Sequence, residues 1–226
     1  MSKNELLLAS TSPRRRQMLA WMVADFEMMS FDIDESIIAG EKAEAYVFRM
    51  AKSKARHALQ GNEHYKLILS SDTIVVQDGK ILGKPENEAQ ARAMLQRLRG
   101  KIHKVLTAIS VVNPESGLMI TDCCIANVPM RNYSDEEIEH YIQSGDPFDK
   151  AGSYAIQNES FHPVEHFSGC FACVMGLPLC HVIRQMKKQG ISIIDDARPV
   201  CAEQLDYACP ISSSVLSFTD QITCCD

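Results

Sequence analysis

The densest group of anion-binding side chains lies near the N-terminus. Residues 10–12 read Ser-Thr-Ser after an apolar run over residues 6–9, and Pro13 precedes three arginines at 14–16. Positive charge at the start of a helix opposes the helix dipole, so stability alone does not explain the arginines. Free N–H groups, hydroxyls and guanidinium groups together can hold a polyphosphate. The pattern favours a phosphate-binding turn, with a solvated basic patch as the alternative.

Two further positions carry carboxylates that could serve phosphate chemistry. Asp34 and Glu35 lie in an acidic cluster that follows an expected strand. Mg²⁺ bound to phosphates takes one or two carboxylates and water, so this cluster could hold a hard cation, and a solvated loop is the alternative. Asp72 interrupts two apolar runs, over 67–69 and 74–76. A carboxylate buried there must be hydrogen-bonded, paired with a cation, or act as a base.

Lysines supply the remaining positive charges. Lys54 lies within the apolar stripe of a helix that the pattern predicts over residues 41–59. We expect its ammonium to point inward toward an anion, either a carboxylate or a phosphate, unless it reaches solvent at the helix edge. Lys84 follows a short strand within Gly83-Lys84-Pro85.

Apolar periodicity predicts the elements that position these groups. In the first part of the chain we expect a strand over 6–9, a helix from Pro13 to about Ala24 with Ser12 as N-cap, a strand near 26–33, the helix over 41–59, strand runs within 67–76 and a hairpin returning through 80–82. Further on we expect a helix between Asn87 and Gly100, long strands over 101–112 and 117–130, a helix with a capping box at Ser134, and a last helix from about 175–179 to Gly190.

Composition limits the classes of partner. The 226 residues suffice for one core or two small lobes. A net charge of −6 argues against binding a nucleic acid polymer, because that requires many phosphate contacts, whereas a small phosphorylated ligand needs only a few cations. No apolar run approaches the length of about 18 residues that spans a membrane, and the N-terminus lacks a signal-peptide pattern. We therefore expect a cytoplasmic protein without a membrane partner.

The nine cysteines are read as free thiols in a reducing compartment. Cys170 and Cys173 form a CxxC pair near Cys180, and Cys224-Cys225 is one of two adjacent pairs. A zinc or redox site is the alternative, although the second half of a paired zinc motif is missing. Beyond residue 194 periodicity fades, so residues 195–226 are expected to form a Cys-containing extension of unknown role whose removal costs little stability.

The ordered motifs resemble the Maf family of nucleoside triphosphate pyrophosphatases, over about residues 5–190. They are Leu8-Ala9-Ser10-x-Ser12-Pro13-Arg14-Arg15, Asp34-Glu35, Lys54, Ser71-Asp72-Thr73, Gly83-Lys84-Pro85, Thr107, Asp149-Lys150-Ala151-Gly152, Ile156-Gln157 and Gly176-Leu177-Pro178-Leu179. The motif around Asp149 resembles the form that this motif takes in the branch of the family that acts on dTTP and UTP. Two departures are Gly169-Cys170-Phe171, where the family usually has Gly-Ser-Tyr, and Ala155, where glycine is common.

The resemblance implies a fold, an activity and a set of residues. It implies an α/β (mixed α+β) fold of the Maf/ITPase type, with a central mixed, elongated sheet flanked by helices, two lobes around a cleft in residues 1–194, and often a homodimer. It implies hydrolysis of a nucleoside triphosphate to the monophosphate and pyrophosphate with Mg²⁺ or Mn²⁺. The positions that match are Asp72 as proton acceptor, Ser10, Arg14, Arg15, Lys54, Thr73, Lys84 and Gln157 as substrate-binding residues, and Glu35 with Asp72 at the metal.

Two questions stay open at this point. Asp72 could be mainly a metal ligand instead of a base. A nucleotide-binding regulator of septum formation with little turnover is the rival function, although carboxylates beside phosphates favour an enzyme.

Overall fold

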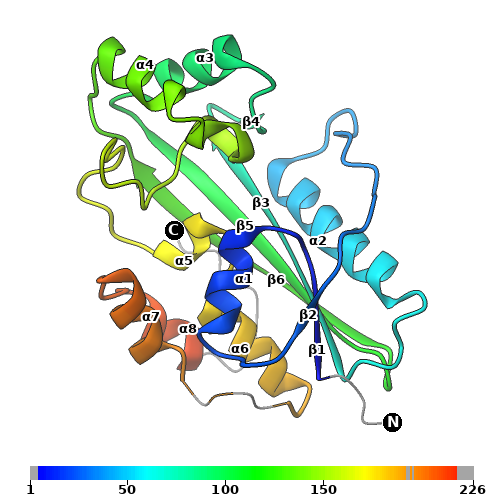
Figure 1. Cartoon of the computed structure of the whole chain (residues 1–226). Coiled ribbons are helices and arrows are strands. Elements are labelled where there is room, and N and C mark those ends of the chain that lie inside the picture. The colour runs from blue at the N-terminus through cyan, green and yellow to red at the C-terminus, as the bar shows by residue number, and fades with distance from the viewer. Residues whose placement is uncertain (1–4, 192–193, 195, 218–226) are drawn as a thin grey trace.

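One six-stranded mixed sheet organises the computed structural model, which describes residues 5–191, 194 and 196–217 (Figure 1). The strands are β1 (Leu6–Ala9), β2 (Glu27–Met28), β3 (Leu67–Gln77), β4 (Lys80–Leu82), β5 (Ile102–Asn113) and β6 (Leu118–Pro129). Their order is β2-β1-β3-β5-β6, and β4 pairs with β3 beside this path. The pairs β1–β2 and β1–β3 are parallel and the others antiparallel. The predicted mixed sheet is confirmed.

Helices cover both faces of this sheet. They are α1 (Pro13–Ala20), α2 (Ala43–Leu59), α3 (Glu88–Leu98), α4 (Asp135–Gln143), the 3-10 helices η1 (Asp146–Asp149) and η2 (Ala151–Ser153), α5 (Phe171–Met175), α6 (Leu179–Lys188), α7 (Arg198–Leu205) and α8 (Ser212–Ser217). Helix α2 packs on one face (Figure 1). On the other face α1, α5 and α6 pack near one end of the long strands, and α3 and α4 near the opposite end. These two groups are the two lobes that the resemblance implied.

A gap along one edge of β3 determines where a ligand can enter. β1 pairs with β3 only as far as Ala9 opposite Ser70, and β4 pairs with β3 from Val75 onward. Between these pairings, residues 71–74 have no partner strand on this edge in the part of the chain that the structure describes. Because successive side chains of a strand point to opposite faces, Ser71 and Thr73 project to one face of the sheet here, and Asp72 and Ile74 to the other.

Several predicted elements are confirmed by their caps and registers. Helix α3 begins at the N-cap Asn87, whose side chain accepts from the N–H of Gln90, and Ser134 and Glu137 form the capping box of α4. β5 and β6 pair antiparallel over their full length. No helix in the described ranges is both long enough and apolar enough to cross a membrane.

The predictions for α1 and β2 extended too far. Helix α1 ends at Ala20 and not near Ala24, because the N–H groups of Trp21 and Met22 bond carbonyls three residues back and tighten the chain into a turn. The strand expected over residues 26–33 is only Glu27–Met28. Its partner β1 has four residues, so the ladder ends after Met28.

The segment after residue 194 is more ordered than its sequence predicts. Within 196–217, helices α7 and α8 place Ala197, Cys201 and Val215 in the apolar cluster that also contains α6. The Val215 carbonyl accepts a hydrogen bond from Arg184 of α6 (3.2 Å). The expectation of an aperiodic appendage was wrong for this range, because helices this short carry too few apolar positions to show a period. The boundary at residue 194 stays a prediction, and Cys224-Cys225 lies outside the described residues.

Candidate functional site

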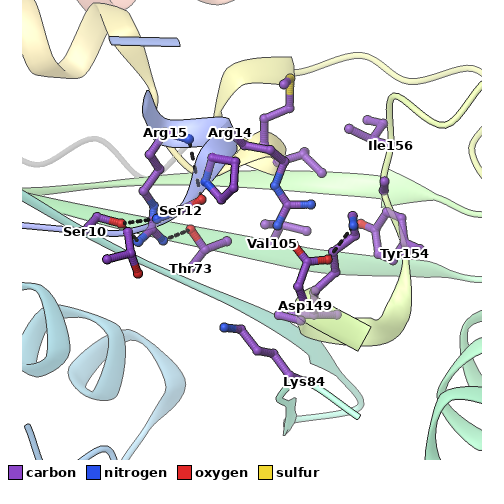
Figure 2. A pocket seen from close by; sticks show the side chains of 18 of the residues that line it. Ser10, Ser12, Arg14, Arg15, Thr73, Lys84, Val105, Asp149, Tyr154 and Ile156 are labelled. Carbon is purple, nitrogen blue, oxygen red and sulfur yellow. Dashed lines mark hydrogen bonds and ion pairs between the residues drawn. The ribbon is translucent and has the colours of Figure 1, made fainter. Parts of the chain in front are cut away.

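A cavity of about 400 Å³ lies at the open edge of β3, between the two lobes (Figure 2). Its volume falls within the range of about 300–1,000 Å³ that is typical of small-ligand sites. It is lined by residues 9–15, Ser30, Phe31, Glu35, Lys54, Thr73, Val75, Lys84, Val105, Asp149, Lys150, Ala151, residues 154–157, Val174 and Met175. The lining combines cationic and hydroxyl side chains with apolar ones, among them Ala151, Ala155 and Ile156.

The turn between β1 and α1 forms the polar end. The side chain of Ser12 accepts from the N–H of Arg15 (3.5 Å), so Ser12 is the N-cap that the sequence predicted. The N–H of Ser12 in turn donates to the Ser10 hydroxyl (3.2 Å), which tightens the turn. Pro13 begins the helix with a backbone angle that already suits it.

The two neighbouring arginines of α1 differ in their contacts. Arg15 donates to the Gly176 carbonyl (3.0 Å), the Ser10 hydroxyl (3.3 Å) and the Thr73 hydroxyl (3.0 Å), so it links the turn to β3 and to the end of α5. The Nε of Arg14 is buried without a hydrogen-bond partner among the described residues, and its guanidinium points into the cavity (Figure 2). Arg15 therefore fixes the shape of the site, and Arg14 is the arginine free to bind an anion.

Lys54 joins the two carboxylates that the sequence singled out. Its ammonium lies 2.6 Å from Asp72 Oδ1 and 2.9 Å from Glu35 Oε1. The inward orientation and the nearby anion that we predicted for Lys54 are confirmed. The loop that carries Glu35 is held by Tyr46, whose hydroxyl donates to the Glu35 carbonyl (2.9 Å).

Asp72 and Thr73 are neighbours in sequence and project to opposite faces of the sheet. Asp72 faces α2 and meets Lys54, whereas Thr73 faces α1 and meets Arg15. Thr73 Oγ1 also lies 3.0 Å from Thr107 Oγ1, a residue whose hydroxyl reaches the Cys173 carbonyl (2.7 Å). The two strand positions therefore differ in access: Thr73 lines the cavity, whereas Asp72 lies behind Lys54.

Lys84 lies two residues after the end of β4 and projects into the cavity (Figure 2). Its side chain is exposed, and its ammonium has no hydrogen bond or ion pair with any residue in the described ranges. Together with Arg14 it is a cation that is available for an anionic ligand.

The opposite end of the cavity is formed by the segment around η2. Gln157 is exposed there, and the Lys150 ammonium is held by Asp149 Oδ1 (2.5 Å). The Tyr154 hydroxyl lies 2.7 Å from His103 Nε2. Burial lowers the pKa of His103 to about 4, so this histidine is neutral at neutral pH.

The CxxC pair has a local structural role. The Cys170 sulfur accepts a hydrogen bond from the N–H of Cys173 (3.3 Å) and so caps α5, a short helix that the sequence did not predict. The cysteines of the described ranges are free thiols, and no group of three or more His, Cys, Asp or Glu side chains in these ranges is arranged to hold a metal ion.

The structure brings the residues that the sequence selected to one place. Those lining the cavity are Ser10, Arg14, Arg15, Glu35, Lys54, Thr73, Lys84 and Gln157. Asp72 is buried behind Lys54 and does not line the cavity. Sequence reasoning gave no role to the Gly176 carbonyl or to Lys150, although both belong to motifs that it quoted. Their contacts join segments far apart in the chain, which residue spacing cannot reveal.

Comparisons with known proteins show what this chain is similar to. A family model described as "Maf-like protein" matches residues 5–189. A dTTP/UTP pyrophosphatase of Geotalea uraniireducens is 40% identical over 84% of this chain and 97% of its own length. Another dTTP/UTP pyrophosphatase, from Hahella chejuensis, is 42% identical over 86% of this chain and 96% of its own. Among solved structures, the Ham1 protein of Staphylococcus aureus covers 73% of this chain and 80% of its own, with 12% identity and a TM-score of 0.42.

Proposed function

This chain belongs to the Maf-like family, and we propose that it is a nucleoside triphosphate pyrophosphatase that hydrolyses dTTP and UTP to the monophosphate and pyrophosphate. The match to the two dTTP/UTP pyrophosphatases covers 97% and 96% of their own lengths. The observation that carries the proposal is the polarity of the cavity. Among the described residues, the lining combines two unpaired cations, Arg14 and Lys84, with apolar side chains and the free amide of Gln157.

The polar end suits a triphosphate. Phosphoanhydride hydrolysis depends mainly on positioning and on neutralising charge, with little covalent work by the protein. Arg14 and Lys84 supply positive charge that no carboxylate in the described ranges neutralises. Arg15 is held by three hydrogen bonds before substrate arrives, so its remaining N–H groups keep a fixed direction. We infer that these residues bind the phosphates and the departing pyrophosphate.

Asp72 is the group that we assign to the attacking water. It would accept a proton from the water that attacks the α-phosphorus, and its carboxylate is paired with Lys54, which lines the cavity in front of it. The sequence left open whether Asp72 acts as base or as metal ligand, and the same position serves either role.

The donor set fits a divalent cation. Glu35 and Asp72 share one ammonium, and Mg²⁺ in phosphate sites takes one or two carboxylates together with phosphate oxygens and water. Glu35 and Asp72 would hold the ion. Bound Mg²⁺ or Mn²⁺ would supply charge neutralisation at the phosphates, as a Lewis acid.

The opposite end suits a pyrimidine. The side-chain amide of Gln157 has a donor and an acceptor, and it has no hydrogen-bond partner among the described residues. Uracil and thymine share a C4 carbonyl and an N3–H, which this amide can match, whereas cytosine presents an amino group and a bare N3. Ala151, Ile156 and Val174 line the cavity nearby as apolar surface for the ring.

A nucleotide panel with separate detection of pyrophosphate and orthophosphate tests the proposal. With Mg²⁺ or Mn²⁺ we expect pyrophosphate from UTP and dTTP, and little orthophosphate. Release of orthophosphate alone would contradict the reaction. Tight binding of UTP without release of either product would favour a nucleotide-binding regulator instead.

Two accompanying proposals concern the setting of this enzyme. We propose a cytoplasmic location, since buried free thiols are typical of a reducing compartment. We also propose a homodimer, as the family resemblance implied, which gel filtration with light scattering would test.

A further inference from the structure

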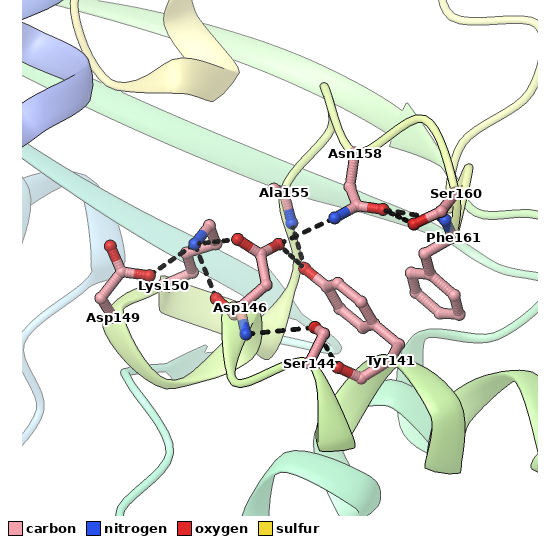
Figure 3. A network of polar contacts seen from close by, with 9 residues as sticks. All are labelled: Tyr141, Ser144, Asp146, Asp149, Lys150, Ala155, Asn158, Ser160 and Phe161. Carbon is pink, nitrogen blue, oxygen red and sulfur yellow. Dashed lines mark hydrogen bonds and ion pairs between the residues drawn. The ribbon is translucent and has the colours of Figure 1, made fainter.

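A tyrosine and an aspartate that do not line the cavity hold the turn that carries Gln157 (Figure 3). The turn runs from Ala155 to Asn158 and is closed by a hydrogen bond from the Asn158 N–H to the Ala155 carbonyl (3.1 Å). Its two central residues, Ile156 and Gln157, line the cavity. The position of this turn therefore determines where the amide of Gln157 meets a bound base.

Both ends of the turn are tied to the same pair of side chains. The hydroxyl of Tyr141, from α4, accepts from the Ala155 N–H (3.0 Å) and donates to Asp146 Oδ2 (2.6 Å). That same oxygen accepts from the side-chain amide of Asn158 (3.2 Å). The phenol and one carboxylate oxygen thus fix the first and last residues of the turn.

The second oxygen of Asp146 extends this network to the cavity. Asp146 Oδ1 accepts from the Lys150 ammonium (2.9 Å), which also donates to the Asp146 carbonyl (2.6 Å). Lys150 lines the cavity, and 8% of its side chain is exposed. Asp146 consequently connects the turn with a cation at the cavity wall.

The protonation states fix the direction of each hydrogen bond. Burial acts to raise the pKa of Asp146, but the hydrogen bonds from Tyr141 and Lys150 hold that pKa below its ordinary value. Burial, together with the hydrogen bond to Asp146, raises the pKa of Tyr141. At neutral pH the carboxylate is therefore ionised and the phenol protonated, so Tyr141 donates to Asp146 and can only accept from Ala155.

We propose that Asp146 is a positioning residue for pyrimidine selection, acting through Tyr141 and Asn158 to hold the backbone that carries Gln157 in one place. This inference rests on the proposed function and deepens it. A site rejects a mismatched base only if its own polar groups cannot shift to re-pair with it. Because the turn is anchored at both ends, the backbone at Gln157 cannot shift to bring its amide toward the amino group and bare N3 of cytosine.

The test uses two variants that remove the anchor in different ways. Tyr141→Phe deletes the hydroxyl and keeps the ring, which stacks on Phe161 at a centroid distance of 4.2 Å. Asp146→Asn removes the charge with little change of shape. In both variants we expect the ratio of kcat/KM for UTP over CTP to fall roughly tenfold, a difference of about 1.4 kcal/mol. In Tyr141→Phe, which keeps the ion pair of Asp146 with Lys150, the affinity for pyrophosphate measured by calorimetry should stay unchanged.

Tyr133→Phe is the matched control. Tyr133 also packs on Phe161 (centroid distance 4.8 Å) and donates a buried hydrogen bond to the Leu95 carbonyl (2.7 Å). In the described ranges, no hydrogen bond or ring contact joins Tyr133 to the turn. We expect it to lower the melting temperature by a similar amount and to leave the UTP/CTP ratio unchanged.

Three results separate the possible failures. An unchanged UTP/CTP ratio in both Tyr141→Phe and Asp146→Asn would overturn the positioning role. An equal fall of the ratio in Tyr133→Phe would also overturn it, because general loosening of this lobe would then explain the effect. The ratio of the calorimetric affinities for UMP and CMP measures base discrimination without turnover. If the wild type releases no pyrophosphate, the proposed function fails while these affinities still decide the role of Asp146.

Discussion

The Lys54 ammonium lies 2.6 Å from Asp72 Oδ1, and it joins helix α2 to the strand β3 across the open edge of the sheet. The side chains of Lys54 and Asp72 are 16% and 12% exposed, so neither charge is well solvated. Each residue therefore determines the electrostatic surroundings of the other, and their contributions to stability and to activity can be separated by substitution.

The first prediction concerns this ion pair. Lys54→Met leaves Asp72 buried without its main cation, so the free energy of unfolding should fall by about 1–3 kcal/mol. Asp72→Asn should lower kcat by roughly 10²- to 10⁴-fold while the protein stays folded. The double variant should regain part of the stability but none of the activity. Denaturant titration and pyrophosphate release measure the two effects, and a near wild-type rate for Asp72→Asn would contradict the role of Asp72.

Base selection gives the second prediction. Gln157→Ala should reduce the kcat/KM ratio of UTP over CTP. In the wild type a mismatch between the amide and cytosine leaves polar groups unpaired, at a cost of about 1–3 kcal/mol each, and the variant lacks the amide that causes this mismatch. The ratio of dTTP over UTP is the internal control, since both bases share the C4 carbonyl and N3–H, and it should change little. If the UTP/CTP ratio is the same in the variant and the wild type, Gln157 does not read the base.

The close approach of Gly176 to the site gives the third prediction. Gly176 has a φ of +106°, and a Cβ there would lie 3.1 Å from the Thr73 hydroxyl and 3.4 Å from Arg15 Nε. Gly176→Ala should therefore displace Arg15 and raise KM for UTP, besides losing roughly 1 kcal/mol or more of stability to backbone strain. Gly117→Ala is the control, because Gly117 has a φ of +69° with open space around it. Equal activity losses in the two variants would show that crowding at Arg15 is not the cause.

A fourth prediction concerns the segment after residue 194. Val215→Ala should cost about 1–2 kcal/mol of stability, because Val215 is 4% exposed within the cluster formed with α6. Removal of residues 196–226 should cost more, since it also strips Ala197 and Cys201 from that cluster. Glu203→Ala, at an exposed position of α7, should change little. A truncated protein with an unchanged melting temperature would mean that α7 and α8 add nothing to the core.

The fifth prediction is a dependence of stability on pH. Burial lowers the pKa of His103 to about 4, below the value of about 6.5 for a histidine in an unfolded chain. Between these values the unfolded chain binds a proton that the folded protein does not, so stability falls as the pH drops from about 6.5 to about 4. The loss should reach about 3 kcal/mol. His103→Gln should flatten this part of the profile relative to the wild type, with His140→Gln on the exposed face of α4 as control. The same slope in His103→Gln would assign the loss to other groups.

Local patterns in the sequence determined most of the fold and the residue types of the site. The Ser12 cap, the apolar stripe that buries Lys54, and the long hairpin of β5 and β6 depend on neighbours within a few residues or on simple periodicity. The same locality explains the errors in α1 and β2. Their ends are set by where a turn tightens and where a partner strand stops. The residues of the segment itself reveal neither position.

The sequence alone predicted a strand-to-helix turn suited to phosphate, a lysine in need of an anion, and a carboxylate between two buried runs. Only the tertiary structure decided that the turn and Lys54 share one cavity at the gap between β1 and β4, with Thr73 on its wall and Asp72 paired with Lys54 behind it. The link from Asp146 to the turn that carries Gln157, and the packing of Val215 on α6, were also decided there. These contacts depend on the distance between side chains in space, which hydrophobic burial fixes for the whole chain at once.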